Sequence, residues 1–407
     1  MTKSKARLAL ILGCAGAALL GAVLFIAQGR QPAPPPPPQK WLAFEPDAAQ
    51  KEKLAELRAT LSAGATRFPN EARRDFENAQ LFMYMAGTSE DDAVVLASLD
   101  AVRYGYSPRG SKKAKPDRDL EKVLVKRLRS KQPAQVQAAF TAAPVALLAQ
   151  EPEGELLEAL LELARSESPA LRWAALESLD LLPPDARPAP VLGAFLRATE
   201  DTPAFAVRGL RALRQSRPTL SSQPELKERA RASARRLLGS SDPGLRGSAL
   251  QALVDLDPSA PGEVSDLARK SLTDPHPYVR GMAAAGLSVG SLGRESDVHL
   301  LMPLVEDFAA AATTLTGPVA LDGKAVELLL NVPGRRLVAE SALFSVQRLA
   351  LGPPPGNPVP DRRPISWKEP PVLTIGGRVS GRELVEQNAA KVLAWYASEK
   401  KKLPPAP

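Results

Sequence analysis

The chain has 407 residues, with 53 Lys or Arg against 45 Asp or Glu and a formal net charge of +8. This length exceeds that of a usual single-core domain, so several domains or a repeat array are expected. One cysteine and two histidines exclude a disulfide framework, a cysteine-based zinc site and multi-histidine metal cages. Abundant Ala and Leu with 5% aromatic residues favour an all-α fold.

Residues 1–30 have the pattern of a cytoplasmic tip and a transmembrane anchor. Leu8–Gln28 is uncharged and almost wholly apolar, and its length matches the roughly 20 residues that cross a bilayer. Lys3, Lys5 and Arg7 precede it, so the positive-inside rule predicts a cytoplasmic N-terminus. Since the Ala, Arg and Pro usage points to a bacterium, we expect a single-pass inner-membrane protein with a periplasmic repeat domain.

Two alternatives to an uncleaved anchor stay open. Ala27–Gly29 is a candidate cleavage site of a signal peptide, and Leu12–Cys14 has a faint likeness to a lipoprotein box. The proline-rich residues 31–40 that follow are predicted to form an extended, stiff spacer between membrane and body.

Residues 41–118 are predicted to form an N-terminal helical cap with a basic loop, since 47–61, 71–85 and 91–102 have helical periodicity. The segment 103–131 holds eleven Lys or Arg against three carboxylates. Outside the cytoplasm nucleic acid is an unsuitable partner, so anionic lipid, an acidic wall polymer or an acidic protein fits better, the alternative being a solubilising charge run. The candidate electrostatic binding residues are Arg109, Lys112, Lys113, Lys115, Lys126, Arg127 and Arg129.

The strongest signal is an internal repeat. Four segments begin at prolines 34, 40 and 34 residues apart, and each has an apolar residue at +2, a small one at +6 and Leu at +10. These positions share one helix face, and Pro is tolerated in a first turn. Each segment is therefore predicted to be the second helix of a pair, with first helices at 155–163, 225–238 and 264–272. The repeat positions are Pro169, Arg172, Leu179, Pro203, Leu213, Pro243, Arg246, Leu253, Pro277, Arg280 and Leu287.

The pattern Pro-x-apolar-Arg-x-x-small-x-x-x-Leu, in Pro169–Leu179, Pro243–Leu253 and Pro277–Leu287, resembles the HEAT repeat, in particular the short variety first associated with phycobilisome lyases. The unit at Pro203 departs from it, with Ala206 in place of Arg. The resemblance implies a curved α-solenoid of stacked antiparallel helix pairs over residues 119–352, with a concave binding face, and does not identify the ligand. In such repeats the recurrent Arg is interpreted as pairing with acidic groups or carbonyls between adjacent units, in preference to reading a ligand.

Weaker copies flank the four units, one at Pro133, with Gln135 where an apolar residue belongs, and one at Pro333. The insertion Thr313–Asp322 is predicted to be a loop or a broken helix. Ser222–Glu225 has the sequence of a capping box that opens a first helix.

The C-terminal part is predicted to begin with a proline-rich extended segment, 353–379, that contains a short hairpin at Val372–Val379. A capping helix and tail, 380–407, follows, and opens with a capping box at Ser380–Glu383. Its apolar face is expected to dock on the last repeats; the alternative is a handle for another protein.

No cofactor, metal or catalytic site is predicted, because His276 lies at a helix start and His299 on a surface near another. The leading hypothesis is a non-enzymatic, membrane-tethered scaffold that binds another cell-envelope protein through the concave face. The alternative is a binder of anionic wall polymer or lipid headgroups through residues 103–131. A third hypothesis, an enzymatic or chromophore-transfer role inherited with the repeats, would call on the two histidines.

Overall fold

The computed structural model describes residues 42–62, 65–74, 77–105, 118–147, 154–257, 262–351 and 382–406. The chain divides into two units, Met1–Lys51 and Glu52–Pro407. The first unit contributes residues 42–51, which include the start of helix α2 (Ala48–Ser62). None of the helices described is long and apolar enough to cross a membrane; the predicted span, Leu8–Gln28, lies outside the described residues.

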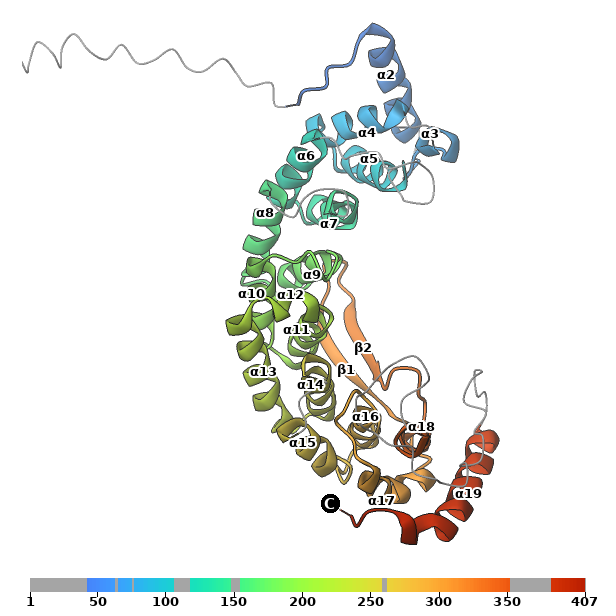
Figure 1. Cartoon of the computed structure of the whole chain (residues 1–407). Coiled ribbons are helices and arrows are strands. Elements are labelled where there is room, and N and C mark those ends of the chain that lie inside the picture. Colours follow the sequence, from blue (N-terminus) through green and yellow to red (C-terminus); the bar gives the residue numbers. More distant parts are fainter. Residues whose placement is uncertain are drawn as a thin grey trace, which may run out of the picture. The chain divides into compact units, whose positions relative to one another are not determined.

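Helices at the N-terminal end of the second unit form a packed group. α4 packs on α5, α5 on α7, and α6 on both α4 and α7 (Figure 1). These helices are α3 (Asn70–Arg74), α4 (Glu77–Thr88), α5 (Asp92–Gly105), α6 (Arg118–Leu128) and α7 (Pro133–Leu147).

The repeats follow as pairs of antiparallel helices. Each first helix packs on the second helix that follows it, and α11, α14, α16 and α18 pack on one another in succession (Figure 1). The first helices are α8 (Glu155–Leu163), α10 (Ala189–Ala198), α13 (Pro224–Leu238) and α15 (Glu263–Ser271). The second helices are α9 (Pro169–Asp180), α11 (Pro203–Gln215), α14 (Pro243–Leu256) and α16 (Pro277–Leu287), with the short α12 (Arg217–Ser221) after α11.

The second helices begin where the prolines predict, because a first-turn Pro loses no helical hydrogen bond. The side chain before Pro accepts a backbone N–H in three of them: Ser168, Asp242 and His276. The small +6 residue lets the paired helix approach: a Cβ on Gly209 would lie 2.5 Å from the Phe195 carbonyl oxygen of α10. These pairs are therefore fixed by proline, cap and small residue together.

Two local predictions about helix starts are wrong. α13 has no side-chain cap, and the Ser222 hydroxyl instead donates to the Thr219 carbonyl at 2.7 Å. The unit at Pro333 does not open at its proline, since α18 (Val338–Leu351) begins five residues later. Pro333 instead comes shortly after strand β2 (Ala325–Asn331). A residue that precedes Pro favours an extended backbone, which suits the end of a strand.

The recurrent arginines join adjacent repeats. Arg246 donates to Asp274 at 2.9 and 2.8 Å and to the carbonyls of Ser240 and Ser241. Arg172 pairs with Asp201 and Arg280 with Asp307 in the same way. Each guanidinium donates to carbonyls of the turn before its own helix and pairs with a carboxylate of the next repeat. The predicted pairing of these arginines between adjacent units is therefore confirmed.

The pair of Arg246 and Asp274 makes stability depend on pH. Burial alone would raise the pKa of Asp274, but hydrogen bonds from Arg246 and from the His276 N–H outweigh it and lower the pKa. A depressed carboxyl pKa stabilises the fold above the unfolded-state value of about 4, and that stability is lost as the pH falls through the folded-state pKa.

Asp274→Asn is therefore expected to lower the free energy of unfolding by about 1–3 kcal/mol at pH 7, with a difference from the wild type that shrinks between pH 5 and pH 3. Urea titrations across this range measure it. Asp322→Asn, in an exposed turn 3.7 Å from Lys324, is the control and should change little at any pH. A difference between Asp274→Asn and the wild type that does not vary with pH would contradict the assigned ion pair.

A β-hairpin stands where a loop or broken helix was predicted. β1 (Ala312–Val319) and β2 (Ala325–Asn331) pair antiparallel, with Thr314 opposite Leu329 and Leu315 opposite Leu328. β1 lies across α9, α11, α14 and α16 (Figure 1), and Leu315 is buried among them. We call this side of the second helices the hairpin face.

The C-terminal end of the array is capped by α19 (Arg382–Glu399), which buries Val385, Val392 and Trp395 in the core of the last repeats against α18 and η2 (Met302–Glu306). The docking predicted for this helix is confirmed. His299, in α17 (Val298–Leu301), is bonded through Nδ1 to the Tyr396 hydroxyl at 2.6 Å and through Nε2 to the Pro404 carbonyl at 2.9 Å. The predicted hairpin at 372–379 and the Ser380 cap lie outside the described residues.

Candidate functional site

Three adjoining cavities follow one another along the second helices, on and beside the hairpin face. One lies between α5 and α7 with a volume of about 260 Å³. A larger one of about 770 Å³, which we call the tip cavity, lies at the hairpin tip beside Ala320, Leu321 and Asp322. The third, of about 170 Å³, lies beside Leu329, Leu330 and Asn331 of β2, and we call it the edge cavity. Gln137 and Thr141 line the first two, and Arg211 lines the last two. Because neighbouring cavities share lining residues, they form one groove, which we call the hairpin groove.

The tip cavity has an aromatic floor. Trp173 of α9 is buried and packs edge-on against Phe205, with ring centroids 5.3 Å apart. The Arg208 guanidinium lies 4.0 Å from the Trp173 ring centroid and donates to Glu177 at 2.9 Å. Burial lowers the pKa of Arg208 although Glu177 and Asp180 act in the opposite direction. The Arg208 guanidinium is thus fixed within the fold by Trp173 and Glu177.

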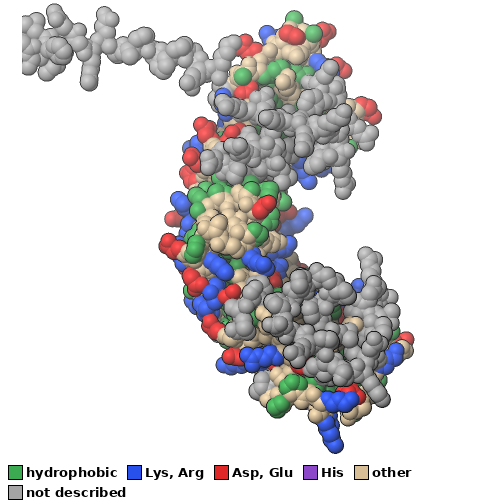
Figure 2. Space-filling view, viewed as in Figure 1, with side chains coloured by type: hydrophobic (Ala, Val, Ile, Leu, Met, Phe, Trp, Pro, Cys, Tyr) green, Lys and Arg blue, Asp and Glu red, His purple; other side chains and the backbone are tan. Residues whose placement is uncertain are grey.

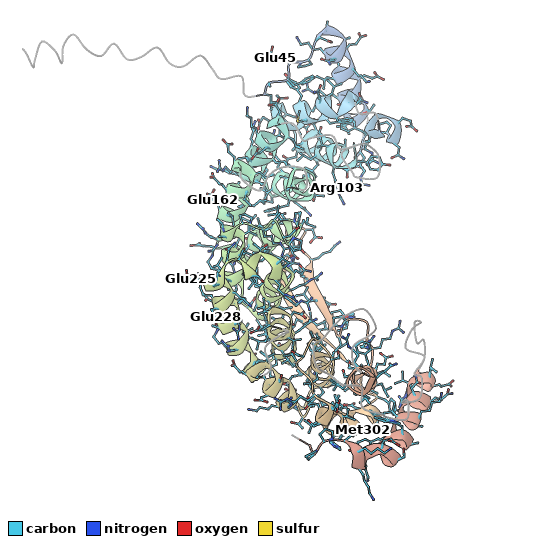
Figure 3. All side chains as sticks on the ribbon, in the orientation of Figure 1. Glu45, Arg103, Glu162, Glu225, Glu228 and Met302 are labelled. Atoms are coloured by element: carbon cyan, nitrogen blue, oxygen red, sulfur yellow. The ribbon has the colours of Figure 1, made fainter. Side chains whose placement is uncertain are left out.

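The rim of the tip cavity is partly apolar. Leu181, at the end of α9, is 46% exposed, and the hairpin turn contributes Leu321. Arg103, at the end of α5, lines the same cavity (Figure 3). A large cavity with an aromatic floor and a mixed rim is typical of surfaces that bind protein segments.

The edge cavity is lined by hydrogen-bonding groups from α11, α14 and α16. Tyr278 is buried, burial raises the pKa of its hydroxyl, and that hydroxyl lies 3.4 Å from the Ser248 hydroxyl. Arg214 pairs with Asp255 at 3.3 Å. Burial also raises the pKa of Asp255, against the opposing effect of Arg214.

Like Arg103 at the rim of the tip cavity, Arg211 is a groove cation whose charge is uncommitted among the residues described. It is exposed, lines both the tip and edge cavities, and makes no ion pair or side-chain hydrogen bond within the described ranges. Its neighbours Arg208 and Arg214 are paired with carboxylates. An anionic group entering the groove would therefore meet Arg211.

The predicted basic site is only partly accessible. Arg127 is 2% exposed and donates to the carbonyls of Ala86, Gly87 and Ser89 and to Gln135. Arg127 thus cannot contact a ligand, and its assignment as a surface binding residue is wrong, because its charge is used inside the fold. Lys126 donates to the Gly87 carbonyl at 3.0 Å and Arg129 lies 3.6 Å from Glu162. The remaining candidates, Arg109, Lys112, Lys113 and Lys115, lie outside the described residues.

The opposite side of the helix pairs differs from the groove. Glu162, Glu225 and Glu228 project from the first helices α8 and α13, away from the hairpin (Figure 3). Acidic and basic side chains are mixed along this side (Figure 2). Because charges of both signs are mixed there, this side presents no electrostatic potential of one sign to a partner. Ion pairs between such exposed side chains are weak and screened by salt.

The described part of the chain holds no group of three or more His, Cys, Asp or Glu that could bind a metal ion. His276 caps α16, with Nδ1 accepting the Tyr278 N–H at 3.2 Å, and both nitrogens of His299 are engaged with the C-terminal segment. The arrangement of the groove is suited to binding by contact and charge.

Comparison with known proteins gives structural similarities alone. Neither the protein-family profiles nor the curated proteins give a match to this sequence. A chain of the complex of Kap95p with RanGDP aligns over 87% of this chain and 44% of its own, with 13% identity and a TM-score of 0.48. The structure of Kap121p bound to Pho4p gives 68% and 30% coverage, 14% identity and a TM-score of 0.45. An engineered protein gives 88% and 97% coverage, 14% identity and a TM-score of 0.38. This chain spans less than half the length of the first two matched chains.

The hairpin is the part of the site that the sequence reading missed. Its signal is present: β-branched residues are frequent over Thr313–Val319, and Asp322-Gly323 is a preferred hairpin turn. Gly323 has φ +80°, and its N–H donates to the Ala320 carbonyl at 3.0 Å. The strong helical period on both sides obscured this short signal.

Proposed function

We propose that the protein is a non-enzymatic, membrane-tethered scaffold that binds another protein of the cell envelope through the hairpin groove. The sequence analysis expects binding on the concave face of the solenoid, and we assign that role to the side of the second helices on which the hairpin lies. The observation that carries the proposal is the groove itself, with its Trp173 floor, exposed Leu181 and uncommitted Arg211. The tether rests on the apolar segment Leu8–Gln28.

The matched experiment is site-specific photo-crosslinking in cells of the full-length chain. A photoreactive residue replaces Leu181 or Val319, which are 46% and 57% exposed on the hairpin side. In the controls it replaces Glu162 or Glu228 on the first helices. We expect one discrete protein adduct at Leu181 and Val319 and none at the control positions. The adduct should be found in the membrane fraction. When residues 1–30 are removed, the protein should move to the soluble fraction.

A second substitution, Leu181→Asp, should reduce the adduct formed at Val319 by placing an unpaired charge in the contact. Adducts of equal yield at Glu162 would move the binding surface to the first helices. The absence of adducts at both Leu181 and Val319 would overturn the proposed function.

A further inference from the structure

Among the described residues, no backbone group pairs with the outer edge of β2, which leaves some of its hydrogen-bonding groups without a partner there. The sheet has two strands within the described residues; β1 lies across the helices, and β2 forms the outer strand, with Leu328 and Leu330 packed against them. The Val332 N–H donates to the Ala311 carbonyl at 3.1 Å, which makes this a hydrogen-bonded pair of the register. Since such pairs alternate in antiparallel ladders, the N–H and C=O groups of Glu327, Leu329 and Asn331 point away from β1.

The usual protections against pairing, a charged residue and a register shift, lie at Glu327 and between Thr316 and Val319, which leaves Leu328–Asn331 without them. β2 is seven residues long and contains no Pro, and its outward residues Glu327 and Leu329 alternate with the helix-facing Leu328 and Leu330. Leu329 is 68% exposed, although a large apolar side chain on an edge strand invites pairing with another chain. An exposed Leu beside unpaired backbone groups favours an added strand.

The edge cavity specifies the chemistry of that strand. Leu329, Leu330 and Asn331 form one wall, and Arg211 and Arg214 stand on the facing helix α11. Alternate side chains of a strand added to β2 would point into this cavity. These side chains would meet the guanidinium groups of Arg211 and Arg214. Arg214 is paired with Asp255, whereas Arg211 has no carboxylate partner among the described residues.

We infer that the edge of β2 takes up an extended acidic segment of the partner protein as a third antiparallel or parallel strand, with a carboxylate of that segment on Arg211. The inference rests on the proposed function and adds to it the form and charge of what is bound. Main-chain hydrogen bonds supply affinity, while the cavity selects the alternate side chains. The Arg211 guanidinium offers a carboxylate paired, charge-assisted hydrogen bonds.

The alternation in the register gives a test that spares the hairpin. Leu329→Pro removes an N–H that points outward and breaks no bond to β1, and Pro is tolerated at such edge positions. Leu329→Thr keeps the N–H and suits a strand, so it is the matched control for loss of the leucine side chain. Exchange protection of the Thr313 and Leu315 amides, which face β2, verifies that the hairpin persists in both variants.

The probe is a display library of random twelve-residue peptides, selected on the full-length wild-type protein in detergent. We expect the enriched peptides to alternate β-branched or apolar residues with polar ones and to contain Asp or Glu. Their affinity should fall at least about tenfold with Leu329→Pro, which corresponds to about one hydrogen bond, and less than about threefold with Leu329→Thr. Arg211→Glu should weaken the binding of these acidic peptides by a similar factor. The Arg211→Glu variant should instead prefer peptides in which Lys replaces the acidic residue.

The outcomes separate the two proposals. Enrichment of no peptide, or of basic or helical peptides, overturns strand addition, and so does equal binding to wild type and Leu329→Pro. If the Leu181 photo-adduct persists in Leu329→Pro, the proposed function stands and strand addition falls. If neither peptide binding nor the Leu181 adduct is found, both fail.

Discussion

Arg127→Ala is expected to lower the free energy of unfolding of the N-terminal helices by about 3–5 kcal/mol, as for removal of one partner from a buried charged network. The guanidinium donates to three carbonyls near the end of α4 and to Gln135, which itself donates to Asp92 at 2.6 Å. Burial lowers the pKa of Arg127 against the opposing effects of Glu90 and Asp92. Truncation removes a charged donor from each of these acceptors, although Lys126 still donates to the Gly87 carbonyl and Ser130 to Gln135.

The control is Arg129→Ala, two residues away. The Arg129 side chain is 59% exposed and lies 3.6 Å from Glu162, so its loss should change stability by about 0–1 kcal/mol. Urea unfolding followed by hydrogen exchange of α4 and α6 measures both variants. Equal effects would show that the Arg127 network contributes no more than a surface ion pair.

The sequence predicts the repeats well because their signals are local. Each second helix is specified by a Pro and a small residue at +6, and three of the four also by a side-chain cap before the Pro, all within a dozen residues. The C-terminal cap is predictable for the same reason, since α19 carries its own apolar face. Domain limits at 119 and 352 and the anchor at 1–30 remain predictions.

What the sequence does not predict depends on partners distant along the chain. Arg187 is 1% exposed, yet in the sequence it is one arginine among many; it is buried because the carbonyls of Leu182 and Ala212 and the Asp180 carboxylate converge on it. Arg127 was misjudged for the same reason, because charge counting alone does not reveal which cations are enclosed.

The groove is another feature of this kind. Arg211 and Leu329 both line the edge cavity although they are far apart in the chain. Local patterns such as helical period and charge runs predict the second helices but not the hairpin laid over them. Only the strand register shows which N–H groups of β2 are free.

Trp173→Ala is expected to have the second large effect, about 3–5 kcal/mol on the stability of the surrounding repeats. The indole is 2% exposed and packs on Phe205, and it carries Arg208 on its face. Removal of the indole leaves a cavity beneath the groove. It also deprives the Arg208 guanidinium, whose charged form burial already disfavours, of its contact with the aromatic ring.

Because repeats contact mainly their neighbours, this loss should remain local to α9, α10 and α11. Hydrogen exchange should therefore rise there while α16 and α18 keep their protection, and the photo-adduct at Leu181 should be lost. Trp173→Phe, which keeps a ring against Phe205 and under Arg208, should retain most of both properties. Loss of protection throughout the array would mean that the repeats unfold as one cooperative unit, and an unchanged Leu181 adduct would show that the partner does not depend on the floor of the tip cavity.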